Sequence, residues 1–173
     1  DAMRVGAPYG VMGDLVRRAA GVREADPVAV KQVKLAQFLG RFLRGADLRS
    51  ALFFLGEMVR APFPNEASEA LAAARADATL MADSIRSATL LLLRAATAQA
   101  PLVLVLDAAA LAAGQPLPTS QHDALGLAGL LLLNKAEHLD ATSRERLQAQ
   151  LPALPLYWTS QGQLPVSALP TAT

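Results

Sequence analysis

The 173-residue sequence contains no cysteine and only two histidines. Disulfides are therefore excluded, and a structural zinc site, which is built from cysteine and histidine, is not expected. The histidines, His122 and His138, have no cysteine or carboxylate at ligand spacing, so we interpret both as surface residues.

Charge of one sign is also lacking. Sixteen Lys and Arg residues face fifteen Asp and Glu residues, which gives a net charge of +1, and the two signs alternate along the chain. A nucleic-acid surface needs a basic patch, so we expect no nucleic-acid partner.

A long hydrophobic run is missing as well. Residues 88–98 contain four consecutive leucines, but Arg94 interrupts the run far short of the ~20 apolar residues that a membrane span needs. The chain begins at Asp1, and no basic-then-apolar signal region follows. We therefore expect no membrane partner. We also expect the chain to be an internal piece of a larger cytoplasmic protein.

The most consequential absence is a phosphate-binding loop. This loop has the pattern Gly-x-x-x-x-Gly-Lys-Ser/Thr, because glycine lets the backbone approach the phosphates and lysine neutralises them. None of the eleven glycines precedes a lysine, and the cluster Gly6, Gly10 and Gly13 has the wrong spacing, with Pro8 inside it. We therefore expect no nucleotide hydrolysis by this chain alone.

The N-terminal half predicts helices with short breaks. Apolar residues make up 53% of the chain, and many are Ala and Leu, which favour helix. Pro8 opens the first predicted helix, whose inner side holds Val11, Leu15 and Val16, and Gly21 ends it. The second predicted helix is capped by Asp26 before Pro27 and ends near Gly45, and the third is capped by Asp47 and reaches Val59. Two further helices are predicted at 66–75 and 79–98, after a loop at 61–65.

The pattern changes at Pro101. Three β-rich runs, Leu102 to Asp107, Leu130 to Leu133 and Leu154 to Thr159, alternate with predicted helices at 108–113, 121–127 and 142–150. We expect Leu139 and Leu147 to provide the apolar contacts of the last helix. Alternation of this kind predicts a parallel sheet with right-handed crossovers. The predicted fold is α/β and P-loop NTPase-like but incomplete, with a helix-rich half (1–100) packed on a small parallel sheet (101–173).

A polar tetrad, Asn134-Lys135-Ala136-Glu137, follows the second predicted strand. It is close to the Asn-Lys-x-Asp signature with which P-loop GTPases read guanine. A carboxylate at Glu137 could accept from both donors on one guanine edge, with Asn134 on the acceptors of the other edge and the Lys135 stem along the base. Glu137 is one methylene longer than the usual Asp. The alternative is a polar strand end with Glu137 in solvent.

Asp107 also follows a predicted strand. A carboxylate there could hold a Mg²⁺-bound water, or it could cap the helix that starts at Ala108, which we favour because no second acid follows. A charged cluster of Arg75, Asp77, Asp83 and Arg86 is interpreted as caps and ion pairs, with an interdomain contact as the alternative.

Residues 101–169 resemble the later part of a CobW-type GTPase, a family of metal chaperones in the SIMIBI P-loop class. The matching segments are Val105 to Ala108, Leu130 to Glu137, Leu139-Asp140, and Pro155 to Gly162. The resemblance implies GTP binding, metal-insertion work, and guanine-reading roles for Asn134, Lys135 and Glu137. The family's phosphate loop and its Cys-x-Cys-Cys motif are missing.

Residues 6–106 are similar to an AAA-type ATPase module of bacterial signalling proteins. The matching segments are Ala7 to Gly10, Arg17 to Val22, Phe54 to Glu57, and Leu80 to Arg86. In that family Leu102 to Asp107 would be the Walker B strand, and Ala108 replaces the second acid. The two resemblances meet at this strand, as in a chimera.

These observations lead to three functional hypotheses. The first is a degenerate, GTPase-derived nucleotide-binding domain without independent catalysis, with GTP and Mg²⁺ as possible ligands. The second is a non-enzymatic helical interaction module that docks a protein partner. The third is a fragment of an ATP-dependent regulatory domain whose phosphate loop was lost upstream of Asp1, so that a missing upstream domain would be its partner.

Overall fold

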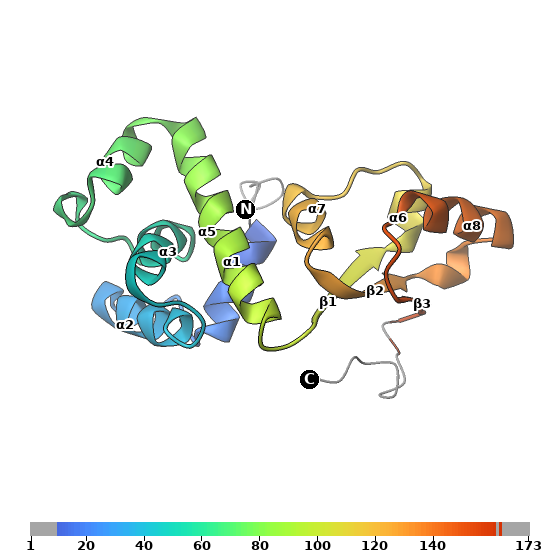
Figure 1. The fold of residues 1–173 in the computed structure, drawn as a ribbon, viewed down its shortest axis with the longest axis horizontal. Helices are drawn as coiled ribbons and strands as arrows, with labels where there is room; N and C mark the ends of the chain where they lie inside the picture. The colour runs from blue at the N-terminus through green and yellow to red at the C-terminus, as the bar shows by residue number, and fades with distance from the viewer. Residues whose placement is uncertain (1–9, 162, 164–173) are drawn as a thin grey trace. The chain divides into compact units, whose positions relative to one another are not determined.

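A computed structural model describes residues 10–161 and 163 of the chain (Figure 1). The chain divides into two compact units, Asp1–Ala95 and Ala96–Thr173, which we call the helical unit and the sheet unit and describe separately. The helical elements are α1 (Gly10–Ala19), α2 (Val28–Leu39), α3 (Gly45–Met58), a 3-10 turn η1 (Asn65–Ala67), α4 (Glu69–Ala76) and α5 (Ala78–Thr97), whose last two residues belong to the sheet unit.

The predicted start of the first helix at Pro8 lies outside the described residues, and the reversal at Gly21, just after α1, confirms its predicted end. Gly21 has φ +66°, its N–H donates to the Arg18 carbonyl at 3.1 Å, and the Val22 N–H donates to the Arg17 carbonyl at 2.9 Å. Glycine adopts this left-handed conformation without a Cβ penalty, which allows the chain to reverse there.

The predicted cap at Asp26 is wrong. Pro27 occupies the position before α2. The Asp26 carboxylate instead accepts from the Arg23 N–H at 2.8 Å and from Lys34 Nζ at 2.6 Å. The Arg23 N–H and the Lys34 ammonium together satisfy the Asp26 carboxylate. The carboxylate therefore does not accept from the unpaired N–H groups in the first turn of α2.

Helix α2 also ends earlier than predicted, at Leu39 instead of near Gly45. The residues after it form a turn in which the Leu43 N–H donates to the Leu39 carbonyl at 2.9 Å, and Gly45, with φ +57°, begins α3. Arg44 takes the capping position of α3, so Asp47 lies in its first turn instead of capping it. Asp47 there still complements the positive end of the helix dipole.

The predicted loop between α3 and α4 is confirmed, although Asn65 already begins η1. Helix α4 starts later than predicted because the Ser68 hydroxyl accepts from the Leu71 N–H at 3.3 Å and so fixes the N-terminus at Glu69. Helix α5 lies within one residue of its predicted bounds.

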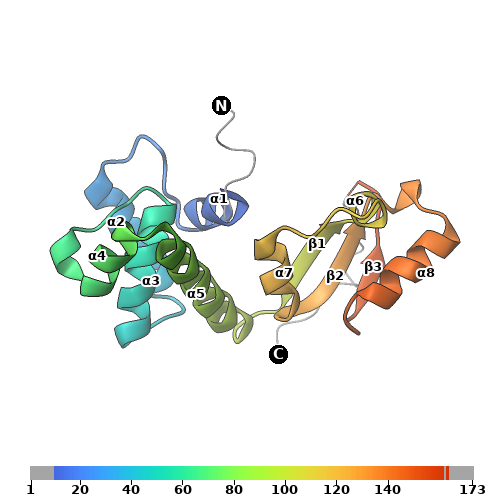
Figure 2. The same ribbon diagram turned by 90° about the horizontal axis from the view of Figure 1, so that it is seen from above.

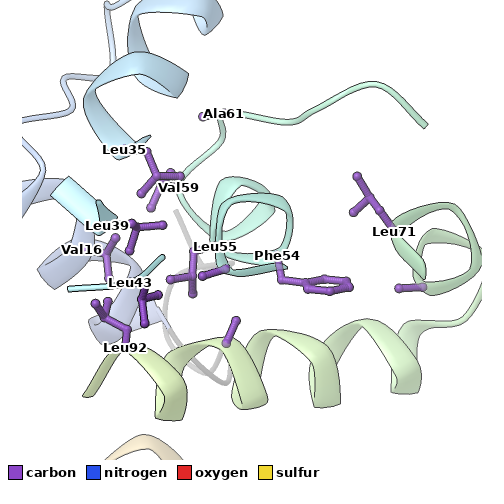
Figure 3. Close-up of a cluster of buried hydrophobic side chains, with 13 residues drawn as sticks. Val16, Leu35, Leu39, Leu43, Phe54, Leu55, Val59, Ala61, Leu71 and Leu92 are labelled. Carbon is purple, nitrogen blue, oxygen red and sulfur yellow. The ribbon is translucent and has the colours of Figure 1, made fainter. Parts of the chain in front are cut away.

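The core of the helical unit forms from leucines on several helices (Figure 3). Leu35 and Leu39 of α2, Leu55 of α3 and Leu71 of α4 are all completely buried. On α1, Val16 is 1% exposed whereas Leu15 is 54% exposed, so the predicted inward position is confirmed for Val16 and wrong for Leu15. Adjacent helical residues point about 100° apart, and the packing of α1 selects Val16.

Two of the four residues of the charged cluster, Arg75 and Asp77, form an ion pair and a helix cap, as the favoured interpretation predicts. Arg75 donates to Glu57 Oε1 at 2.5 Å, to the Phe63 carbonyl at 2.7 Å, and to Asn65 Oδ1. Asp77 Oδ1 accepts from the Thr79 N–H at 2.8 Å and thereby caps α5.

The sheet unit is an α/β structure, as predicted. Its elements are β1 (Leu102–Asp107), α6 (Ala108–Ala112), α7 (Thr119–Leu125), β2 (Ala128–Asn134), a 3-10 turn η2 (Ala136–His138), α8 (Ala141–Gln150) and β3 (Leu156–Trp158). The strands are parallel in the order β1-β2-β3, which confirms the predicted sheet, and Figure 2 shows β2 between its neighbours. The crossover helices place consecutive strands side by side.

The core of this unit lies between the sheet and its helices. Leu106 and Leu133 are completely buried and Leu147 of α8 is 4% exposed. Leu139 packs against the same cluster, so both predicted contacts of the last helix are confirmed. Among the described residues, no helix is both long and apolar enough to cross a membrane.

Candidate functional site

The candidate site lies at the carboxyl edge of the sheet, where the strand register places Asp107 beside Asn134 and Leu133 beside Trp158. The tetrad follows β2 at this edge. Ligands of open parallel sheets bind beyond the carboxyl ends of the strands, so this edge is the place where functional side chains are expected.

Asp107 at the end of β1 is a helix cap and an ion-pair partner. Its Oδ1 accepts from the Ala110 N–H at 3.0 Å, and its Oδ2 accepts from Lys135 Nζ. The hydrogen bond from Lys135, with the backbone donor at Ala110, lowers the pKa of Asp107. The favoured capping interpretation is therefore confirmed, and a Mg²⁺-bound water would have to compete with two protein donors.

Over the described residues, no group of three or more His, Cys, Asp or Glu side chains could hold a metal ion. Magnesium needs several oxygen ligands, some of which substrate phosphates and waters can supply. The role of Asp107 toward magnesium stays a prediction.

Asn134 is connected to the end of β3. The Thr159 hydroxyl, on a residue that is 5% exposed, donates to Asn134 Oδ1 at 3.2 Å. The backbone continues the connection, because the Thr159 N–H donates to the Leu133 carbonyl at 2.9 Å and the Ala136 N–H donates to the Thr159 carbonyl at 3.1 Å. This role of Thr159 was not predicted from the sequence. The available signal was a polar residue directly after the aromatic pair Tyr157-Trp158.

Lys135 turns the chain at the strand end. Its φ of +62° is left-handed, a conformation that is uncommon for residues other than glycine. Its ammonium binds Asp107, and this hydrogen bond and charge raise the pKa of Lys135. The turn brings the Ala136 N–H toward Thr159 and places Glu137 in η2.

Glu137 presents its carboxylate to solvent. Its side chain is 40% exposed, and its Oε1 lies 3.7 Å from Nε2 of His138. His122 and His138 are both exposed, as predicted. The structure thus brings Asn134, Lys135 and Glu137 into one turn, in which two residues are bound to neighbouring strands and the third is accessible.

Arg144 of α8 braces this turn, and the sequence analysis did not identify it. Its Nη2 donates to the Ala136 carbonyl at 2.6 Å, and its guanidinium lies 5.6 Å from the ring centroid of Trp158. Its Nε is buried and has no hydrogen-bond partner among the residues that the structure describes. These contacts hold the backbone at Ala136, the residue directly before Glu137.

No family model, curated protein or solved structure matches the chain. The CobW-type and AAA-type resemblances therefore rest on the quoted residues alone.

Proposed function

We propose that the sheet unit is a GTPase-derived, cytoplasmic nucleotide-binding domain that recognises the guanine base and has no catalysis of its own. The observation that carries this proposal is the juxtaposition of Asn134, Lys135 and Glu137 in one braced turn at the carboxyl edge of the sheet.

The accessible Glu137 carboxylate supports selection of guanine. A carboxylate can accept from the N1–H and the exocyclic amino group of guanine at once, whereas adenine presents an acceptor at N1 and would be repelled. The Lys135 ammonium is held by Asp107 at the same edge, so its stem is available to lie along a base.

The sequence contains no phosphate loop, so the base is the part of the nucleotide that this site would grip. A ligand that binds only the native state raises the unfolding midpoint, and at a hundredfold excess over its dissociation constant it adds about 2.7 kcal/mol. Guanosine should therefore raise the midpoint nearly as much as GTP, and Mg²⁺ should add little.

The test is thermal unfolding with guanosine, adenosine, GTP and ATP, each with and without Mg²⁺. We expect a rise with guanosine and GTP that disappears in Glu137→Gln, which keeps the shape of the side chain but exchanges one acceptor for a donor. Glu145→Gln on the exposed face of α8 is the matched control and should retain the rise.

Equal midpoints with guanosine and adenosine, in a chain that unfolds cooperatively, would contradict the proposal. That result would favour the helical interaction module. In that module the exposed valines of α2, Val30 (40% exposed) and Val33 (56% exposed), would contact the partner.

A further inference from the structure

A basic pocket in the helical unit has no role in the guanine proposal. It has a volume of about 140 Å³, and its charged lining consists of Arg17, Arg23, Lys31, Arg60 and the single carboxylate Glu24. Four cations and one anion leave a net charge of +3 on the lining. We call it the Lys31 pocket.

Two helix ends build this pocket. The reversal at Gly21 after α1 leads the chain into Val22, Arg23 and Glu24. The end of α3 makes a similar reversal at Arg60, where φ is +60°, the Arg60 N–H donates to the Glu57 carbonyl at 3.2 Å, and the Ala61 N–H donates to the Gly56 carbonyl at 2.8 Å. Glycine is the usual residue at such a helix end, so backbone geometry does not explain an arginine there.

Lys31 is the least exposed of the four cations that line the pocket. The residue is 9% exposed, and no hydrogen bond or ion pair joins its ammonium to any residue that the structure describes. Lys34, one turn further along α2, bonds to Asp26 at 2.6 Å. The stem of Lys31 is therefore packed while its ammonium keeps contact with solvent in the pocket, where it can meet an anion directly.

The neighbouring cations are only partly neutralised. Arg17 pairs with Asp14, and the side chain of Arg60 lies 3.4 Å from the Glu24 carboxylate, with both groups mostly exposed. Exposed pairs of this kind are weak and exchange easily with a stronger anion. Arg60 and Arg23 can therefore turn toward a ligand held by Lys31.

We propose that the Lys31 pocket binds a phosphate group. Its volume leaves room for a compact anion such as phosphate, which has five heavy atoms. Guanidinium groups bind phosphate oxygens in pairs, while an ammonium acts as a point charge. The apolar floor of Val22 and Val59, 8% and 1% exposed, excludes water behind the bound anion.

The experiment is titration calorimetry of the full chain with inorganic phosphate, phenyl phosphate and acetate. Phosphate should bind at least tenfold more tightly than acetate, because a dianion meets more of the lining charge. Phenyl phosphate distinguishes the sources of the group: equal or tighter binding assigns the pocket to phosphorylated small molecules, whereas binding of inorganic phosphate alone assigns it to the free anion. Acetate binding as tight as phosphate would overturn the proposal.

Four variants test the lining. Lys31→Met keeps the buried stem and should weaken phosphate binding at least tenfold. Arg60→Gly should weaken it severalfold without lowering the thermal midpoint, because glycine suits φ +60°. Glu24→Gln removes the competing carboxylate and should tighten binding severalfold. Arg18→Gln, an exposed arginine of α1 outside the lining, is the control and should leave binding unchanged.

Equal effects of Arg18→Gln and Arg60→Gly would show general charge attraction and overturn the assignment. If Lys31→Met does not fold, Arg60→Gly and Glu24→Gln still decide, because both change exposed side chains and must shift phosphate affinity in opposite directions. Unchanged affinity in both of them also overturns the proposal.

Discussion

Left-handed backbone at residues other than glycine occurs in the described chain at Arg60, Lys135 and Gln161. Two of the three carry a charged side chain of a proposed site, Lys135 at the sheet edge and Arg60 in the Lys31 pocket. Unfavourable backbone conformations persist where the surroundings fix them, and they gather at functional positions. The positions of Lys135 and Arg60 in this group therefore support both proposed sites independently.

Gly56 of α3 is a residue for which the absence of a side chain matters. A Cβ there would lie 2.9 Å from the Ala61 carbonyl oxygen and 3.1 Å from the Phe63 ring. We expect Gly56→Ala to lower the free energy of unfolding by about 1–3 kcal/mol, since overpacking forces the backbone to shift. Urea denaturation measures the change.

Gly126→Ala is the matched control. Gly126 has φ −70°, and a Cβ there meets nothing within 4 Å, so stability should be unchanged or slightly raised. Equal stability of Gly56→Ala and the parent would mean that the turn after α3 relaxes freely.

At the scale of elements, side-chain caps determine where several helices begin. Ser68, Asp107 and Asp140 each accept a hydrogen bond from a backbone N–H three residues ahead. Of these caps, Asp107 is predictable from the sequence, whereas the predicted caps Asp26 and Asp47 are wrong. Asp is a good cap by residue type, but whether it caps depends on which donors lie within reach.

We expect Ser68→Ala to destabilise the chain by about 1 kcal/mol, because the Leu71 N–H then lacks its partner. Ser87→Ala, an exposed position inside α5, is the control and should be neutral or slightly stabilising, since alanine favours helix. Urea denaturation of both variants gives the comparison, and equal effects would show that the cap contributes nothing.

At the scale of the whole molecule, we expect three aspartates spread over both units to contribute to the loss of stability in acid. The pKa values of Asp26, Asp107 and Asp140 lie below the ordinary aspartate value of 3.8, mainly because of side-chain hydrogen bonds from Lys34, Lys135 and Ser143. A carboxylate whose pKa is lower in the folded state stabilises the fold above its unfolded pKa, and this contribution is lost as the pH falls through the folded pKa.

Stability from these groups should therefore be constant from pH 7 to about 5 and should decrease below about pH 4. In Asp107→Asn this decrease should be shallower, because one of the three groups no longer titrates. Urea denaturation at stepped pH measures the slope, and an unchanged slope in the variant would rule out Asp107 as a contributor. For Lys135 the pH dependence is reversed. Its raised pKa stabilises the fold below pH 10.5, and this contribution to stability is lost as the pH rises further.

Sequence pattern by itself determined the α/β class, the three parallel strands, the bounds of β1 and α5, and the turn that holds Asn134, Lys135 and Glu137. These depend on local properties: apolar runs, helical periodicity, and turn residues a few positions apart. Tertiary structure decided that Val16 and not Leu15 is buried, that Asp26 bonds Lys34, that Thr159 meets Asn134, and that Lys31 lies buried among three arginines. Each of these is a contact between residues separated along the chain or a choice between adjacent ones, and packing sets such contacts whereas spacing does not.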